Sequence, residues 1–111
     1  MRVLLIEDDE LLRPQLARNL RRSGYRVDEA PDGEVGLQLF KERGPDIVVT
    51  DIFMPNREGL ETIMELRKLR PELPIIAMSG GSLERQRFLR IAGLLGAHAM
   101  ISKPFTSADL I

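Results

Sequence analysis

The stretch VLLIEDD at residues 3–9 sets four consecutive apolar residues directly before three acidic ones. A second stretch, IVVTD at residues 47–51, ends a similar run with Asp51. Short, continuously apolar runs rich in β-branched residues are typical of strands that are covered on both faces, as in a parallel sheet. The acids that follow such runs are then expected at one edge of the sheet. Like charges gathered there repel one another unless a proton or a cation neutralises them.

Strands and helices alternate along the chain. Further strands are predicted at 75–78 and 97–101, and residues 25–30 alternate in the manner of an edge strand. Apolar residues at helical spacing predict helices between the strands. These residues are Leu11, Leu12, Leu16 and Leu20; Val35, Leu37, Leu39 and Phe40; Leu60, Ile63, Met64, Leu66 and Leu69; and a fourth set from Leu83 to Leu95. This βαβαβαβαβ order predicts a doubly wound α/β domain with helices on both faces of a five-stranded parallel sheet.

Two features interrupt this pattern. Pro14 would lie inside a first helix begun at Glu10, where it removes a backbone donor, so we expect that helix to start late or to kink. Residues 106–111 have the form of a capped helix start of about one turn. We therefore expect residues 1–111 to form one domain with a truncated fifth helix, and any output domain to lie outside this chain.

Composition narrows the class of protein. The 111 residues suffice for one domain with its own core, at 43% hydrophobic content. A formal charge of -1, from 16 basic and 17 acidic residues, gives no electrostatic footprint for nucleic acid or an anionic membrane. The chain has no cysteine, which excludes disulfides and thiolate metal sites. No stretch has the length of a membrane span, and we expect a cytoplasmic protein.

Asp8, Asp9 and Asp51 are the candidate metal ligands. Oxygen donors without nearby His or Cys indicate a hard cation, and Mg²⁺ in proteins binds one or two carboxylates, several waters and a phosphate oxygen. The alternative is that Asp8 and Asp9 only cap the first helix, because acids are favoured at helix N-termini. Asp51, at the end of a different strand, favours the metal site.

Two further residues follow predicted strands at the same edge. Lys103, before Pro104, has an ammonium suited to a phosphate, although a solvated lysine is the more common case. Ser79, before two glycines, has a hydroxyl that can donate a hydrogen bond to an anion, although a turn serine is the more common case for such a residue alone. These residues are specific only in combination with the acids.

Four motifs in this order resemble the receiver domain of bacterial two-component response regulators. They are Glu7-Asp8-Asp9, Asp51 followed by Met54-Pro55, Ser79-Gly80, and Lys103-Pro104-Phe105. The resemblance extends over essentially the whole chain. It implies a flavodoxin-like sheet in the order 2-1-3-4-5 and a phosphoacceptor signalling domain, a switch and not a multiple-turnover enzyme on an external substrate.

The resemblance also implies a role for each motif. Asp51 would be the phosphoacceptor, Lys103 would pair with the phosphoryl group, and Ser79 would be the switch hydroxyl. Asp8, Asp9, Asp51 and the main-chain carbonyl of Phe53 would hold Mg²⁺, for which Mn²⁺ can substitute. The implied partners are a sensor histidine kinase or a histidine phosphotransfer protein, then an output domain, a downstream protein or a second copy of the chain.

One departure from the family pattern lies three positions before the lysine. Receivers commonly have an aromatic residue there, whereas this chain has Met100, which has no ring to report the switch. Two other functions stay open: a Mg²⁺-dependent phosphatase or phosphotransferase, and a pseudo-receiver that only binds proteins. The chain shows no obvious second acid or cap for the former, and the presence of Asp51, Ser79 and Lys103 argues against the latter.

Overall fold

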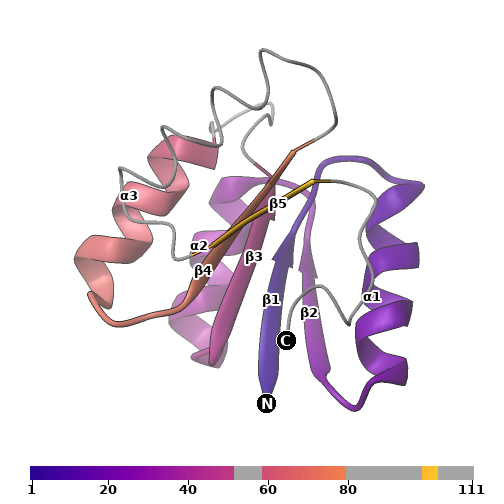
Figure 1. The fold of residues 1–111 in the computed structure, drawn as a ribbon. Helices are drawn as coiled ribbons and strands as arrows, with labels where there is room; N and C mark the ends of the chain where they lie inside the picture. Colours follow the sequence, from indigo (N-terminus) through magenta and orange to yellow (C-terminus); the bar gives the residue numbers. More distant parts are fainter. Residues whose placement is uncertain (52–58, 80–98, 103–111) are drawn as a thin grey trace.

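Five parallel strands form a single sheet in the computed structural model, which describes residues 1–51, 59–79 and 99–102 (Figure 1). The strands are β1 (Arg2–Ile6), β2 (Arg26–Ala30), β3 (Ile47–Asp51), β4 (Ile75–Ser79) and β5 (Ala99–Ser102). Their order in space is β2-β1-β3-β4-β5, and every neighbouring pair is parallel. The flavodoxin-like order expected from the sequence is therefore confirmed.

Three helices connect the strands in the described part of the chain: α1 (Leu12–Arg22), α2 (Gly33–Arg43) and α3 (Gly59–Leu69). The late start expected for the first helix is confirmed, because Pro14 is the third residue of α1. The missing N–H of a proline costs little in a first turn, where backbone donors lack a partner within the helix. The helices predicted at 83–95 and 106–111 lie outside the described residues.

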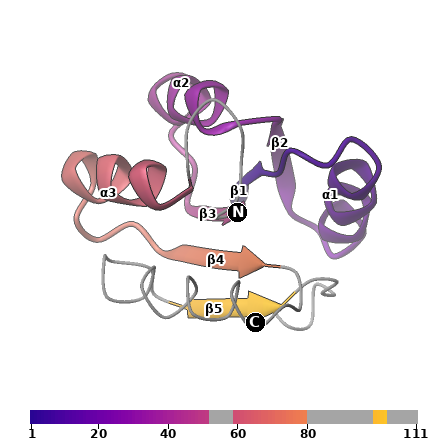
Figure 2. The ribbon, with the colours of Figure 1, turned by 90° about the horizontal axis from the view of Figure 1, so that it is seen from above.

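The core lies on both faces of the sheet. Figure 2 shows α1 on one side of the sheet and α3 on the other. On the α1 side, Leu16 and Leu20 pack with strand residues such as Leu5 and Val49. On the opposite side, residues of α2 and α3 pack with the alternate strand residues, including Leu4 and Ile6. Because both faces are covered, each central strand is continuously apolar in sequence.

Leu11 does not join this core, which corrects the expectation that it shares the buried face of the first helix. The residue precedes the first helical residue, Leu12, and its side chain is 81% exposed. On α3, Met64 and Leu69 are also exposed, whereas Ile63 and Leu66 are fully buried. Apolar spacing alone thus marked these helices correctly but overestimated the width of their buried faces.

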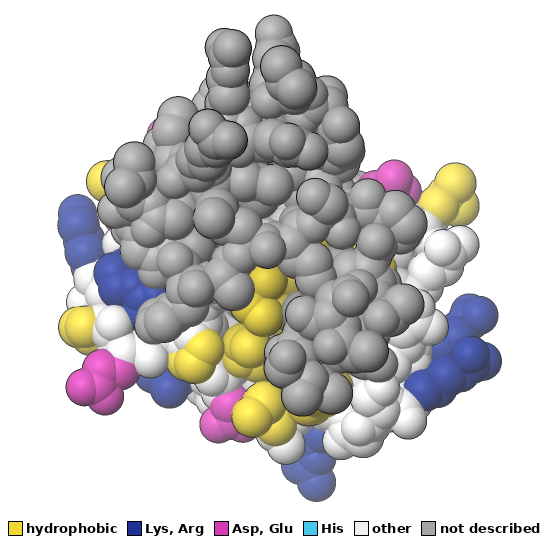
Figure 3. Space-filling model, in the orientation of Figure 1, with side chains coloured by type: hydrophobic (Ala, Val, Ile, Leu, Met, Phe, Trp, Pro, Cys, Tyr) yellow, Lys and Arg dark blue, Asp and Glu magenta, His cyan; other side chains and the backbone are white. Residues whose placement is uncertain are grey.

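The surface of the described residues shows no strongly charged face in the view of Figure 3. Positive and negative side chains both lie around the rim, and neither sign gathers into one patch there. Among residues 1–51, 59–79 and 99–102, no helix has the length and apolar character needed to cross a membrane.

Gly36 of α2 sets how closely that helix approaches the end of β1. A Cβ atom at this position would meet the Ile6 side chain, with Ile6 Cγ1 only 2.8 Å away. Ile6 is fully buried and directly precedes Glu7, so its side chain has little room to move. The absence of a side chain at position 36 therefore lets α2 pack against the strand that ends at the acidic residues.

We expect Gly36→Ala to lower the free energy of unfolding by about 1–3 kcal/mol, the usual cost of overpacking a core. The sign is informative, because the same substitution inside an unobstructed helix stabilises by about 0.5–1 kcal/mol. Urea unfolding of the parent and the variant measures the difference. In an Ile6→Val background, which removes the terminal methyl group, the loss should be smaller; an equal loss in both backgrounds would contradict the clash.

Candidate functional site

The ends of β1 and β3 bring acidic residues to the same edge of the sheet. Ile6 and Thr50 are partners in the parallel register of these two adjacent strands. Glu7 and Asp51 each follow one residue later, so they lie at the same level. Side chains alternate between the two faces of a strand, which places Asp51 on the face of Val49, the side covered by α1.

Glu7, Asp8 and Asp51 form a group in which one carboxylate oxygen from each residue lies within 4.8 Å of the other two. The Glu7 side chain is fully buried, Asp51 is 1% exposed, and Asp8 is half-buried. Burial and mutual repulsion both disfavour several negative charges in so small a volume. Three oxygen donors of this kind fit a hard divalent cation such as Mg²⁺, which would neutralise them.

Asp9 is not a member of this group. Its Oδ1 atom accepts hydrogen bonds from the backbone N–H groups of Leu11, at 2.9 Å, and Leu12, at 3.0 Å. These donors belong to the start of α1, where backbone N–H groups lack partners within the helix. Asp9 therefore stabilises the helix start, and its assignment to the metal stays a prediction.

Glu7 is the residue of this group that the sequence analysis did not select. Glu7 is the first residue after β1, and Asp51 is the last residue of the neighbouring strand β3. The signal was present in the sequence, because in the row of four acids at residues 7–10 the one closest to the buried strand is held most firmly by it. A count of residues from the ends of the two apolar runs would have paired Glu7 with Asp51.

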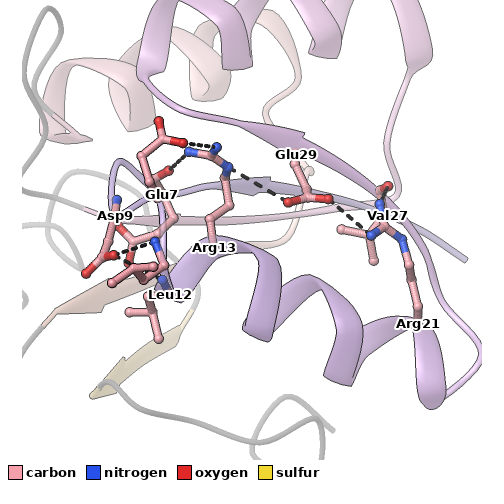
Figure 4. A network of polar contacts seen from close by, with 9 residues as sticks. Glu7, Asp9, Leu12, Arg13, Arg21, Val27 and Glu29 are labelled. Atoms are coloured by element: carbon pink, nitrogen blue, oxygen red, sulfur yellow. Dashed lines mark hydrogen bonds and ion pairs between the residues drawn. The ribbon is translucent and has the colours of Figure 1, made fainter.

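Arg13 ties the acidic segment to α1, as Figure 4 shows. Its Nη1 donates a hydrogen bond of 3.0 Å to the main-chain oxygen of Glu7. Its own backbone N–H donates to the main-chain oxygen of Asp9, at 2.9 Å. On the other side, its Nε lies 3.8 Å from a carboxylate oxygen of Glu29 on β2. The acids are thus carried by a segment that is held at several points.

The remaining predicted site residues follow the neighbouring strands. Ser79 is the last residue of β4, adjacent to β3, and its partner in β5 is Ser102. The backbone of Ser79 therefore ends at the same edge of the sheet as Asp51, while its hydroxyl is not described. Phe53 and Lys103 lie outside the described residues, and Met100 lies within β5 as the partner of Ala77.

Comparison with known proteins agrees with this arrangement. The family model of the response regulator receiver domain matches residues 3–111. The chain belongs to this family. The receiver fold, its parallel sheet order and the acidic edge described above are thus features of one recognised module.

Relatives with assigned names are response regulators. Response regulator MprA of Mycobacterium sp. (strain KMS) is 37% identical over the whole chain, which spans 47% of that protein. The MprA of Mycobacterium leprae is 36% identical over the whole chain, which spans 48% of that protein. The chain thus covers about half the length of these relatives.

Solved structures agree on the fold. A response regulator receiver domain protein from Clostridium thermocellum has a TM-score of 0.90 at 28% identity, with 98% of this chain and 86% of that chain covered. The receiver domain of NtrX from Brucella abortus has a TM-score of 0.86 at 31% identity, with 97% and 90% covered.

We expect Asp9→Ala to lower the free energy of unfolding by about 1 kcal/mol, because two backbone N–H groups lose their acceptor at the start of α1. Asp9→Asn is the matched control, since an asparagine oxygen accepts the same hydrogen bonds. Chemical unfolding followed by circular dichroism measures both. Equal midpoints for Asp9→Ala and the parent chain would show that these hydrogen bonds do not stabilise the helix.

Proposed function

We propose that this receiver domain accepts a phosphoryl group on Asp51, in a Mg²⁺-dependent reaction, from a sensor histidine kinase or a histidine phosphotransfer protein. The main support is the position of Asp51 at the end of β3, 1% exposed and within the group of three carboxylates. A carboxylate held in this way is oriented for attack before the donor arrives. The family match over residues 3–111 supports the same reaction.

Each residue has a defined part in the proposed transfer. An Asp51 carboxylate oxygen attacks phosphorus and forms an acyl phosphate, while the bond from phosphorus to the donor nitrogen breaks and the imidazole leaves. Lys103 pairs with the phosphoryl oxygens as a point charge. Ser79 donates its hydroxyl to the same group once it is attached. With so little covalent chemistry for the protein to perform, catalysis is mainly positioning and charge stabilisation.

Glu7, Asp8 and Asp51 would hold the Mg²⁺ ion, together with the main-chain carbonyl of Phe53, and Mn²⁺ can replace it. The metal, when bound, supplies positive charge to the phosphoryl oxygens. The cluster of Glu7, Asp8 and Asp51 supports Glu7 as the metal ligand in place of Asp9, to which the resemblance gave that role. Asp9 then acts on the site through α1, whose start it stabilises.

The phosphorylated domain would act as a switch and not as a multiple-turnover enzyme. A phosphoryl group adds charge and acceptor oxygens, which can draw Ser79 and its loop toward Asp51 and change the surface beyond. The relatives extend beyond the span that this chain matches, which supports control of an output domain or another protein. A second copy of the chain is a further candidate partner, and the cytoplasm is the proposed location.

Incubation with acetyl phosphate and Mg²⁺ tests the phosphoacceptor. We expect intact-mass analysis to show one phosphoryl adduct on the parent chain and none on Asp51→Asn, because the amide is a poor nucleophile. Omission of Mg²⁺ or addition of a chelator should abolish the adduct.

Other results would point to the competing functions. Steady release of phosphate with many turnovers would indicate a phosphatase or phosphotransferase. An unmodified parent chain, still folded, would indicate a domain that only binds proteins.

The metal ligands are tested by Glu7→Gln and Asp9→Asn, two isosteric changes that each remove one negative charge. We expect Glu7→Gln to weaken Mg²⁺ binding, so that the Mg²⁺ concentration needed for half-maximal phosphorylation rises about tenfold. This is the scale found when a metal site loses a supporting group. Asp9→Asn should cause a smaller loss, since the asparagine still caps α1. The reverse order would show that Asp8 and Asp9 are the metal-binding pair.

A further inference from the structure

Arg13 is a charged residue that neither the metal site nor the phosphoacceptor chemistry has used so far. It lies in the first turn of α1, and its side chain is only 14% exposed. The guanidinium contacts three elements: the segment after β1 through Glu7, its own helix start through Glu10, and β2 through Glu29. These contacts restrict the conformations that the Arg13 side chain can adopt.

The contact with Glu7 is to the backbone and not to the carboxylate. Arg13 Nη1 donates to the Glu7 main-chain oxygen at 3.0 Å, a hydrogen bond from a charged donor. That oxygen belongs to the peptide that joins Glu7 to Asp8, the two adjacent members of the carboxylate group. Rotation of this peptide would move both side chains, so the bond restrains two of the three acids together.

Glu29 in turn holds the guanidinium. One of its oxygens lies 3.8 Å from Arg13 Nε, and the other lies 3.1 Å from Arg21 Nη1 (Figure 4). Arg21 also donates to the main-chain oxygen of Val27 on β2, at 2.8 Å. Glu29 is thus fixed on the edge strand by one arginine and presents its second oxygen to the other.

We propose that Arg13, oriented by Glu29, is a positioning residue for the metal-binding carboxylates of Glu7 and Asp8. This inference rests on the metal site of the proposed function. Arg13 would act on the carboxylates through its hydrogen bond to the Glu7 backbone. This action has a different effect on metal binding from that of the Arg13 charge. Removal of a positive charge near an anionic site favours cation binding, whereas release of the Glu7–Asp8 peptide disfavours it.

Binding of Mn²⁺ alone, measured by electron paramagnetic resonance of the free ion, distinguishes these opposite signs without any phosphorylation. We expect Arg13→Gln to weaken Mn²⁺ binding about tenfold, as loss of a supporting group around a metal site does. Glu29→Gln should weaken it in the same direction but less. Arg13→Lys, which keeps the charge but not the planar fork of donors, should also bind Mn²⁺ more weakly than the parent.

Arg21→Gln is the matched control. It removes the same charge from the same Glu29 carboxylate, but Arg21 contacts the Val27 oxygen instead of that of Glu7. We expect a smaller loss of Mn²⁺ affinity than in Arg13→Gln, because Arg13 still donates to the Glu7 oxygen, even if the unfolding midpoint falls as it does for Arg13→Gln. A direct signature accompanies this: the amide nitrogen resonance of Asp8 should shift in Arg13→Gln and not in Arg21→Gln, because it shares a peptide with the Glu7 oxygen.

Folded Arg13→Gln that binds Mn²⁺ as tightly as the parent, or more tightly, would overturn the positioning role. If Arg13→Gln does not fold, Glu29→Gln decides, and parent-like affinity there overturns the proposal. A parent chain that does not bind Mn²⁺ at all would instead overturn the proposed metal site, and the role of Arg13 with it. If Glu7→Gln loses Mn²⁺ binding while Arg13→Gln and Glu29→Gln keep it, the proposed metal site stands and only the inference about Arg13 is overturned.

Discussion

The parallel register between β1 and β3 is the constraint on which the rest of this structure depends. Ile6 pairs with Thr50, and every preceding pair of the two strands follows from that alignment. A shift of one residue would turn the apolar side chains of a strand to the wrong faces, so the two core clusters strongly specify it. The same alignment sets Glu7 level with Asp51. The gathering of acids is thus a consequence of core packing, and the core stabilises an arrangement that the charges alone oppose.

The start of α1 is the second element of the site. Asp9 satisfies backbone donors of that helix, and Arg13 returns from it to the Glu7 oxygen. The segment between β1 and α1 is therefore held by hydrogen bonds at both ends, although it has no regular structure of its own. Since the positive end of a helix dipole also lies here, the local field favours negative charge in this region.

Membership of the receiver family joins these observations to signalling. The chain spans about half the length of the MprA relatives, and the receiver domain model matches residues 3–111 of it. In the proposed function, the chemical event is the attachment of one phosphoryl group to one carboxylate, and another surface must then recognise this change. The acids and the elements packed against them would determine whether the phosphoryl transfer takes place. Recognition of the changed surface would depend on the domain or protein that the receiver contacts.

Most of the fold was accessible from the sequence because local signals agreed with one another. Continuous apolar runs, helical spacing and Pro14 predicted the strands, the three described helices and the late start of α1, and the resemblance supplied the strand order. Leu11 shows the limit, since its spacing fits the buried face while its position before the helix leaves it exposed. Periodicity records the type of residue and not the point at which the backbone enters the helix.

The candidate site, like the fold, was predictable from the sequence only in part. The sequence by itself determined that acids end two buried strands, and hence that Asp51 meets at least one acid from the first motif. Only the tertiary structure decided which ones, because the register of β1 against β3 and the turn into α1 direct three successive acidic side chains differently. Glu7 and Asp8 join Asp51, whereas Asp9 turns toward the start of α1. Neighbours in a sequence share composition, but their side chains diverge in space wherever the backbone leaves a strand.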